Sequence, residues 1–535
     1  MYQSLLTRRY LTSQIMPLLA SLAVMLCTAM VLIVWSVMGG FLATFVNQGR
    51  VLVGDVIVAW PNIGFAYYDD LAARLEQDPE VAATAPIIEA FGLVGLPDGR
   101  QETVRLLGID GARYAKVTSY GDSIYWRALL KPLPKDAAGA DWRTKKEDHD
   151  IYQRMYDNAL TMKTDRLVNE LQAARDPARR AAARPGAVLG IMMSGFNSRD
   201  PAGFFMPRAR VKLLPDGTKE WVETILPIED SVTVNVLPLD RKGRPTDMVS
   251  RAFPVINEFH TGLYEVDNKT VLLELGALQQ MLKMDAARRI KTDATGAAGR
   301  VGGVSKTAEG EKFVLPETVG EDPARITTLL VRGKGDAATA RLEDLRARVE
   351  RIYAQFAADH KGEVPDASSI RILTWEDQNA TLITAVKKET ALVLSLFSFI
   401  SLTAVFLVLA IFWSMVSEKT REIGILRSLG ASRAGITWLW VRYGLAIGVI
   451  GAALGLLMSY LIVSNINPIH EWMGARMGIQ IWDPRIYYFT VIPTDLSAMK
   501  VLIVCTGGVL SSAAGALWPA LRAARMDPVT ALRFE

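Results

Sequence analysis

Four long apolar runs without charged residues stand out from an otherwise mixed polar and apolar sequence. They span Leu11–Gln48, Thr390–Ser417, Tyr443–Asn467 and Val501–Leu521. A helix needs about 20 apolar residues to cross the hydrocarbon core of a bilayer, and each run is long enough. We therefore expect an α-helical membrane protein with four transmembrane helices.

Arginines before the first run raise the alternative of an export signal. Arg8 and Arg9 precede Leu11, in the manner of a twin-arginine signal. The apolar run is much longer than the apolar region of a signal peptide, which has about 7–15 residues. We therefore interpret it as an uncleaved anchor.

Basic residues also predict the orientation in the membrane. Short loops rich in Lys and Arg stay in the cytoplasm, and such residues lie before the first run, after the second and after the last. Both termini are then cytoplasmic. The prediction has three parts: residues 1–48 form a cytoplasmic N-terminus and a first transmembrane and stalk helix, 49–378 an extracytoplasmic domain, and 379–535 a permease domain with three transmembrane helices.

Strand-like and helix-like patterns alternate at both ends of the segment 49–378, which predicts a large α+β domain. The expected strands are 55–59, 327–331 and 370–374, with a hairpin of 87–96 and 101–109 and helices at 69–77 and 337–359.

Three further segments lie between those ends. Residues 185–282 alternate apolar and polar positions in short runs, which predicts a β-rich subdomain. Residues 131–184 are dense in charge with helical periodicity over 151–175, so we expect a charged, solvated helical insert without a large apolar face. Residues 285–322, rich in Gly, Ala and Lys, are expected to form a mobile loop.

A charged segment, 418–433, joins the second and third apolar runs. Ile423, Leu426 and Leu429 recur at helical spacing, and Gly430 stands where a helix commonly ends. This pattern predicts a short amphipathic helix that docks a partner. The plainer alternative is a helix that only anchors two membrane helices at the headgroups.

Several motifs favour the docking interpretation. Glu418-Lys419 with Glu422–Ser432, and the C-terminal Pro519–Arg533, resemble the FtsX-like/MacB permease superfamily of ABC transporters. Val37–Phe41 and Tyr487–Pro493 are similar to its lipoprotein-releasing (Lol-type) permeases. The resemblance implies a porter-like exported domain and a coupling helix that contacts the ATPase. The implied coupling residues are Glu418, Glu422, Ile423, Leu426, Arg427, Leu429 and Gly430.

Small residues four residues apart recur in the last two runs, as two pairs one heptad apart in the third run and as a series of three in the fourth. Such stripes let helix backbones approach closely in lipid, so we expect these two helices to pack tightly on each other. The residues are Gly444, Gly448, Gly451 and Gly455 in the third run and Gly507, Ser511 and Gly515 in the fourth.

The first two runs lack a glycine stripe and are expected to be movable walls. An acyl chain that leaves the bilayer would enter sideways between their outer halves, because exposing it to water is costly. The expected cargo gate comprises Val34, Val37, Met38 and Phe41 in the first run and Leu394, Phe397 and Leu402 in the second. Ordinary lipid-facing or packed side chains are the alternative for each.

The chain shows no enzyme motif of its own. No phosphate-binding loop is present, so ATP and Mg²⁺ would be bound by a separate ATPase and this chain would hold no cofactor. The histidines His149, His260, His360 and His470 form no metal-ligand spacing. At 535 residues, 50% hydrophobic and a net charge of +4, the composition carries no nucleic-acid signature.

The main hypothesis is a permease subunit in the bacterial inner membrane that releases lipoproteins. The expected partners are an ABC ATPase dimer, a second copy or a sister permease, membrane lipid, lipoproteins and a periplasmic carrier. The alternatives are MacB-like export of small molecules or lipids, and FtsX-like mechanotransmission that regulates an extracytoplasmic hydrolase.

Overall fold

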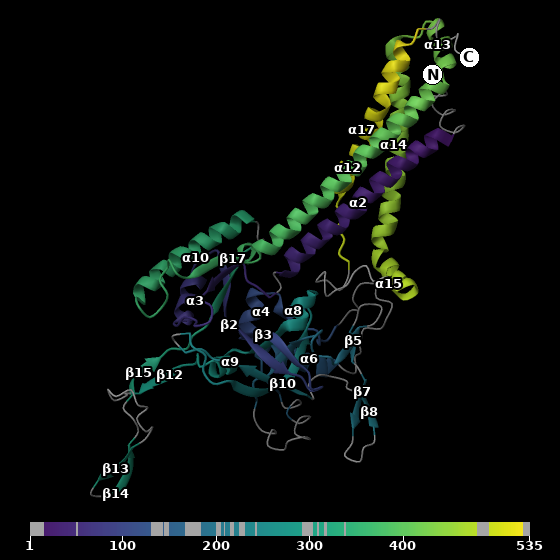
Figure 1. The fold of residues 1–535 in the computed structure, drawn as a ribbon. Helices are drawn as coiled ribbons and strands as arrows, with labels where there is room; N and C mark the ends of the chain where they lie inside the picture. Colours follow the sequence, from purple (N-terminus) through teal and green to yellow (C-terminus); the bar gives the residue numbers. More distant parts are fainter. Residues whose placement is uncertain are drawn as a thin grey trace. The chain divides into compact units, whose positions relative to one another are not determined.

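A computed structural model describes most of the chain. It covers residues 15–49, 52–129, 143, 149–165, 169, 183–199, 205–207, 209–213, 219–223, 230–240, 243–290, 303–307, 310–314, 318–335, 339–478 and 492–527. Expectations for Arg8, Arg9 and Arg533, for most of 131–148 and 166–182, and for 487–491 therefore lie outside the described residues. The chain divides into two compact units, a helical unit (1–46 and 380–535) and a sheet unit (47–379) (Figure 1).

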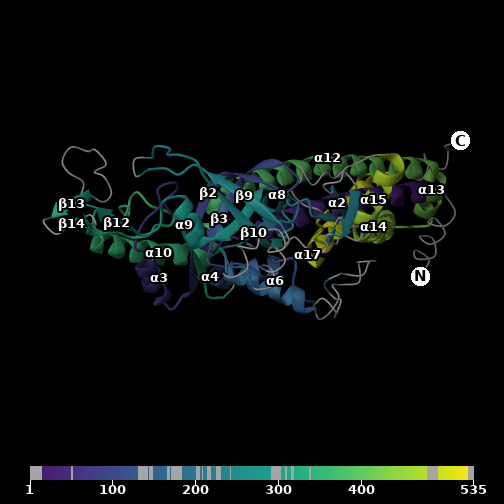
Figure 2. The same ribbon diagram turned by 90° about the horizontal axis from the view of Figure 1, so that it is seen from below.

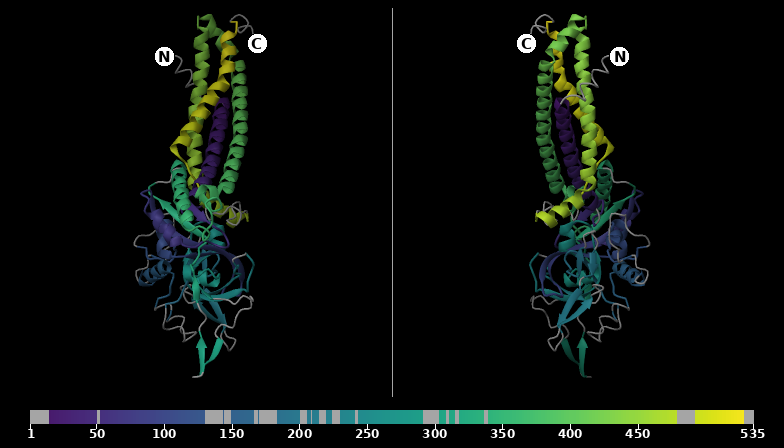
Figure 3. Two further views of the ribbon diagram at one scale, coloured as in Figure 1. Left: turned by 90° about the vertical axis from the view of Figure 1, so that its left-hand side faces the viewer. Right: turned by 90° about the vertical axis from the view of Figure 1, so that its right-hand side faces the viewer.

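The helical unit contains four helices that are long and apolar enough to cross a membrane within the described part of the chain. They run alongside one another (Figure 3). The second has 39 residues, about 58 Å at 1.5 Å per residue, so it exceeds a hydrocarbon core of about 30 Å. The four helices are α2 (Ile15–Gly49), α12 (Ala380–Glu418), α14 (Arg433–Ser464) and α17 (Ala498–Arg525), with shorter α13 (Thr420–Ser428) and α15 (Ile466–Met477) between them.

Aromatic and small side chains hold one end of this unit together. Phe412 of α12 meets Trp440 and Tyr443 of α14 edge to face, with ring centroids 6.5 and 5.8 Å away. Ser512 of α17 donates a hydrogen bond from its Oγ to the carbonyl of Gly444, at 2.9 Å. This core therefore joins α12, α14 and α17.

One nine-stranded sheet organises the sheet unit, with strand order β17-β1-β16-β2-β3-β11-β4-β10-β9. The hairpin expected from the sequence is confirmed, because β2 and β3 pair antiparallel from Ile87↔Ile109 to Gly95↔Gln101. The strands are β1 (Val56–Ala59), β2 (Val81–Gly95), β3 (Gln101–Ile109), β4 (Ala187–Gly190), β9 (Ser231–Val236), β10 (Val249–Phe259), β11 (Thr270–Glu274), β16 (Thr328–Gly333) and β17 (Arg371–Thr374).

Part of the sheet closes on itself through the long strand β2. Its first half pairs with β16, and its last residues, Gly92–Gly95, pair with β9. Six strands, β2-β3-β11-β4-β10-β9, thus form a closed circuit of hydrogen bonds. In the segment 185–282, where a β-rich subdomain was expected, β4, β9, β10 and β11 continue the same sheet. Two small ladders stand outside it: β5 (Asn197–Arg199) with β6 (Phe205–Pro207), and β7 (Ala209–Leu213) with β8 (Lys219–Glu223).

Helices cover the sheet unevenly. Leu71 and Leu75 of α3 and Val349 and Phe356 of α10 share one core cluster with Val58, and both helices lie together on that side (Figure 2). The other face is covered in part by Tyr114 of α4 and by the segment after it. The helices of this unit are α3 (Tyr68–Glu76), α4 (Gly111–Val117), α5 (Tyr120–Ser123), α6 (His149–Thr161), α8 (Tyr264–Lys269), α9 (Leu275–Met281), α10 (Thr339–Asp359) and α11 (Trp375–Gln378).

The charged insert packs on the sheet, contrary to the expectation of a solvated helix. Its described helix, α6, buries Tyr152 and Met155 at 1% exposure each. Tyr152 stacks on Trp126 with ring centroids 5.9 Å apart, and Asn257 donates a hydrogen bond from Nδ2 to the Met155 carbonyl at 2.9 Å. Exposed charges on the rest of α6 concealed this buried face, which runs from Tyr152 to Ala159.

Regular structure also occurs where a loop was expected at 285–322. The described residues there form two antiparallel ladders. They are β12 (Ala287–Ile290) with β15 (Thr318–Asp322), and β13 (Gly303–Thr307) with β14 (Gly310–Val314). Short strands give no helical period, so composition alone did not predict them.

Candidate coupling and transport sites

A sharp turn separates α13 from α14. Gly430 has φ 92°, a conformation that glycine adopts without the strain of a side chain. The amide of Ala431 donates to the Leu426 carbonyl at 3.0 Å, and Ser432 accepts a hydrogen bond on its Oγ from the Gly435 amide at 3.1 Å. The expected C-cap glycine therefore ends one helix, and Ser432 begins the next.

The apolar residues of the α13 segment point in two directions. Ile423 is 3% exposed and belongs to the core of the helical unit. Leu429 is 79% exposed and Ile425 is 45% exposed. The expected single face of Ile423, Leu426 and Leu429 is therefore divided, because Ile423 anchors α13 to its own bundle. Leu429 and Ile425, with half-buried Leu426, are left to meet a partner.

Polar residues of this segment hold its shape. Lys419 donates to Glu422 at 2.5 Å, one turn along the chain. Arg427 donates from Nη1 to the Ala431 carbonyl at 3.3 Å, across the turn. Glu418 and Glu422 are exposed. Arg427 thus stabilises the connection to α14, whereas the two glutamates face outward.

The glycine stripe of α14 packs against two helices, α17 and α2, whereas only α17 was expected. A Cβ at Gly444 would lie 2.6 Å from the Cβ of Ala516 in α17, and one at Gly448 would lie 3.0 Å from Ser512 of the same helix. A Cβ at Gly451 would lie 2.7 Å from Val24, and one at Gly455 would lie 2.7 Å from the Met25 carbonyl, both in α2. Spacing predicted the face but not which helix would occupy it.

The small residues of α17 also differ in their surroundings. A Cβ at Gly515 would meet Val408 of α12 at 3.1 Å, whereas one at Gly507 would meet nothing within 4 Å. Gly507 and Ser511 instead line a cavity of about 180 Å³ inside the helical unit. The cavity is bounded by α2, α12 and α17, and its other lining residues are Val24, Cys27, Thr28, Val31, Ser401, Val405, Val408, Val504, Gly508 and Ser512.

The first helix, which was expected to be a movable wall, contacts α17 and the residues just before it. The amide of Asp495 donates to the Ser36 carbonyl at 3.0 Å, and a Cβ at Gly40 would lie 2.6 Å from the backbone of Thr494. Lys500 pairs with Asp495 at 2.7 Å beside Gly39. Together with the contacts of Gly451 and Gly455, these tie α2 to α14 and α17.

The residues of the expected cargo gate lie on α2 and α12 with different exposure. Val34, Val37, Met38 and Phe41 of α2 are half-buried. On α12, Leu394 and Phe397 are half-buried and Leu402 is 50% exposed. Cys27 donates to the Oγ of Ser401 at 3.2 Å, which places α12 beside α2, about two to four turns from the α2 residues and within about two turns of the α12 residues.

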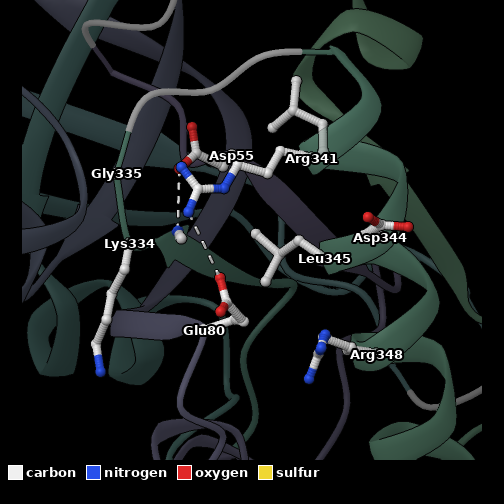
Figure 4. Close-up of a pocket in the computed structure, with 10 residues that line it drawn as sticks. Asp55, Glu80, Lys334, Gly335, Arg341, Asp344, Leu345 and Arg348 are labelled. Atoms are coloured by element: carbon white, nitrogen blue, oxygen red, sulfur yellow. Dashed lines mark hydrogen bonds and ion pairs between the residues drawn. The ribbon is translucent and has the colours of Figure 1, made fainter.

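A surface pocket in the sheet unit holds many charges, shown in Figure 4. Its volume is about 230 Å³. Arg341 reaches across Gly335 towards Glu80, 4.0 Å away, and Asp55 accepts a hydrogen bond from the Gly333 amide at 3.0 Å. Arg348 pairs with Asp78 at 3.5 Å. These charges neutralise one another, so the pocket stabilises the junction of β16 and α10.

The sequence pattern did not predict the exposure of Ile425 or the contacts of Thr494 and Asp495 with α2. Ile425 lies two residues from Ile423, on the other side of the helix, so the helical period excluded it. The contacts with α2 depend on the Gly39-Gly40 pair, whose close approach to another backbone could have been suspected from the two adjacent glycines. Among the described residues, no group of three or more metal-ligand side chains occurs.

Comparison with known proteins explains the arrangement of the helical unit. Residues 394–528, from α12 to the end of α17, match the FtsX-like permease C-terminal family. The helical unit therefore carries an FtsX-like permease domain. The chain is 30% identical over 183 residues to the lipoprotein-releasing system transmembrane protein LolC of Xylella fastidiosa. That match covers 33% of the chain and 44% of the relative, so the chain spans less than half of that relative's length.

Two other relatives extend the comparison. LolC of Neisseria meningitidis is 22% identical over 369 residues, which cover 66% of the chain and 75% of that protein. The ABC transporter permease YtrF of Bacillus subtilis is 31% identical over 121 residues, 22% of the chain and 27% of the relative. The chain thus joins an FtsX-like permease domain to a large sheet unit.

Proposed function

We propose that this chain is the permease subunit of an ABC transporter that releases lipoproteins from the bacterial inner membrane. The observation that carries the proposal is the length of the similarity to the Neisseria meningitidis LolC. It extends over 369 residues, whereas the shared permease family accounts only for residues 394–528. The resemblance to lipoprotein-releasing permeases therefore includes part of the sheet unit, which a generic FtsX-like permease would not require.

The exposed apolar residues around α13 support a coupling role. Ile425 and Leu429 are large apolar side chains beside charged neighbours, and this is typical of a helix that inserts into a groove on a partner. We place the ATPase subunit there, with ATP and Mg²⁺ bound by that subunit. Both termini and α13 then face the cytoplasm, and the sheet unit is extracytoplasmic.

Helix α12 is the element suited to carry motion from the ATPase. It is continuous from Ala380 to Glu418 and ends one residue before α13. Only 6% of its most apolar stretch is buried, against 39% for that of α14, so beyond its contacts with α14 and α17 at Phe412 and Val408 few neighbours hold it. ATP-driven movement of α13 would shift α12 along α2, which is tied to α14 and α17, and open a path for an acyl chain. A second copy or a sister permease would complete the path.

The proposal is tested by reconstitution in proteoliposomes. The chain, its ATPase and the permease encoded beside it are supplied with a fluorescent triacylated lipoprotein and a soluble lipoprotein carrier. We expect lipoprotein to appear on the carrier with ATP and not with a non-hydrolysable analogue. ATP hydrolysis without release, combined with transport of a small amphiphile or activation of a hydrolase, would instead assign the chain to an export or a mechanotransmission system.

A further inference from the structure

One face of the sheet unit is only partly covered by helices. The strands β17, β1, β16, β2 and β3 are neighbours in the sheet, and α3 and α10 pack on one side of them. The registers Ala59↔Arg371, Ala59↔Thr328 and Thr328↔Ile87 place these four residues in one row on the opposite side. The adjacent row contains Leu373, Ile57 and Leu330, so aliphatic side chains continue across several strands.

This face forms the floor of a groove of about 560 Å³. The volume lies within the usual range of small-molecule sites, about 300–1,000 Å³. Ile57 and Leu330 on the floor are 4% and 2% exposed. The other aliphatic and sulfur-containing lining residues are Leu52, Val53, Leu107, Leu237, Leu239, Leu282, Met284 and Leu373.

Apolar side chains also extend over one rim of the groove. Phe91 is 73% exposed and Leu237 is 53% exposed, although both contribute to the lining. Large apolar residues that lie exposed beside an apolar groove are typical of a binding surface. We interpret this rim as the entrance for an apolar ligand.

The charges of the groove differ in what they contact. Arg105 pairs with Glu89 at 2.7 Å, and Asp377 accepts hydrogen bonds from Thr374 and Arg346. The backbone of Arg371 pairs with β1, but its exposed guanidinium makes no hydrogen bond or ion pair with any described side chain. It lies on β17, three strand spacings from β2, roughly 14 Å across the sheet. One cation therefore remains to attract an anionic group, away from the apolar rim.

We propose that this groove binds the acyl chain of an anionic amphiphile, with the head group at Arg371 and the chain along Ile57 and Leu330. A polypeptide strand would need unpaired backbone groups, which a sheet offers at its edge and not on its face. The floor presents only side chains, so an acyl chain can lie on it, and burial of the chain's methylene groups away from water is favourable. The proposal stands on the groove alone and does not require the proposed transport function.

The test uses the full chain in phosphatidylcholine nanodiscs with two probes: a diazirine-bearing hexadecanoic acid and the corresponding hexadecanol. After photolysis, peptides are analysed by mass spectrometry. We expect both probes to label the peptides that contain Ile57, Leu330 and Leu373, and the acid to label them more strongly. Arg371→Gln should lower labelling by the acid severalfold and leave the alcohol unchanged, because it removes only the cation.

Two variants block the groove itself. Ala59→Trp fills it and should reduce labelling by both probes, and Leu237→Glu, at an exposed rim position, should reduce labelling by the acid in particular. The matched control is Leu93→Trp, since Leu93 is exposed on the same strand as Phe91 but does not line the groove. Thermal unfolding and gel filtration establish that each variant is folded.

Three outcomes would overturn the proposal. One is labelling confined to the membrane helices. Another is labelling by both probes that neither Ala59→Trp nor Arg371→Gln changes. The third is that a photocrosslinking amino acid in place of Phe91 captures a polypeptide segment and no lipid probe, which would make the groove a protein-binding site.

Discussion

Leu429 and Ile423 are apolar residues of one short segment, but they differ in exposure and therefore in what they contact. Ile423 is buried in the helical unit, whereas Leu429 is 79% exposed just before Gly430. We expect Leu429→Asp to weaken ATPase binding roughly 10- to 150-fold, because burial of a leucine contributes about 1.5–3 kcal/mol. Binding of the purified ATPase to the detergent-solubilised chain measures this.

Controls separate lost binding from lost folding. Ser428→Asp adds the same charge at an adjacent exposed position and should have a much smaller effect. Ile423→Ala should lower thermal stability, since it empties a buried position. Equal ATPase affinity for Leu429→Asp and the unmodified chain would show that the partner docks elsewhere.

The glycines of α14 and α17 make a second residue-scale prediction. A leucine at Gly455 would drive its Cβ to 2.7 Å from the Met25 carbonyl, whereas Gly507 has nothing within 4 Å. We expect Gly455→Leu to destabilise the helical unit by about 1–3 kcal/mol, as overpacking does, and Gly507→Leu to have little effect. Thermal unfolding in detergent compares them, and equal melting temperatures would refute the close α2–α14 approach.

The carboxyl of Asp70 makes the folding stability of the sheet unit depend on pH. Hydrogen bonds from Arg74 and His360 lower the pKa of its carboxyl below the usual 3.8. A lowered pKa stabilises the folded state above the unfolded value, and this contribution is lost as the pH falls through the folded value. Asp70→Asn should therefore reduce stability at pH 6 slightly and flatten the loss of stability below about pH 4. Thermal unfolding between pH 3 and 6 measures the slope, and an unchanged slope would contradict the assignment.

At the scale of elements, helix α6 makes a structural contribution that its charge conceals. Met155 is 1% exposed and its carbonyl accepts a hydrogen bond from buried Asn257. We expect Met155→Ala to cost about 2–5 kcal/mol, in contrast to exposed Arg154→Ala on the same helix. Urea unfolding of both variants, followed by tryptophan fluorescence, distinguishes them. Equal urea midpoints for Met155→Ala and Arg154→Ala would instead support the original expectation of a solvated insert.

Local patterns predicted the elements better than their partners. The β2–β3 hairpin followed from alternation and from Pro97-Asp98-Gly99 between the two strands. The pairing of β4 with both β10 and β11 did not, because sequence alternation says which residues share a face and not which strand lies alongside. The same limit applies to Gly451 and Gly455, whose spacing could not identify α2 as their neighbour.

The candidate sites show the same difference between local features, which the sequence predicts, and packing, which it does not. The end of α13 at Gly430 was predictable, since a helix stop is a local signal. The burial of Ile423 and the uncovered sheet face beneath Phe91 depend on what packs nearby, which no local pattern records.

At the scale of the whole molecule, the orientation in the membrane is open to a direct test. In a chain carrying Cys27→Ser and Cys505→Ser, we expect a cysteine at Ser428 to be shielded from a membrane-impermeant thiol reagent in intact cells. One at Asp366, exposed in the sheet unit, should be labelled. Permeabilised cells provide the control in which both react. Labelling at Ser428 in intact cells would reverse the proposed topology and remove the coupling role.

The pairing of β1 with β17 has a consequence for how the chain is made. Ala59 lies opposite Arg371, more than three hundred residues later. At a synthesis rate of about 5–20 residues per second, β1 waits roughly 15 to 60 s for this partner. Until then, the newly made sheet unit has an unpaired strand edge, which is a template for aggregation. Helix α12 begins a few residues after β17, so the sheet can first close at about the time when synthesis reaches this second long apolar helix.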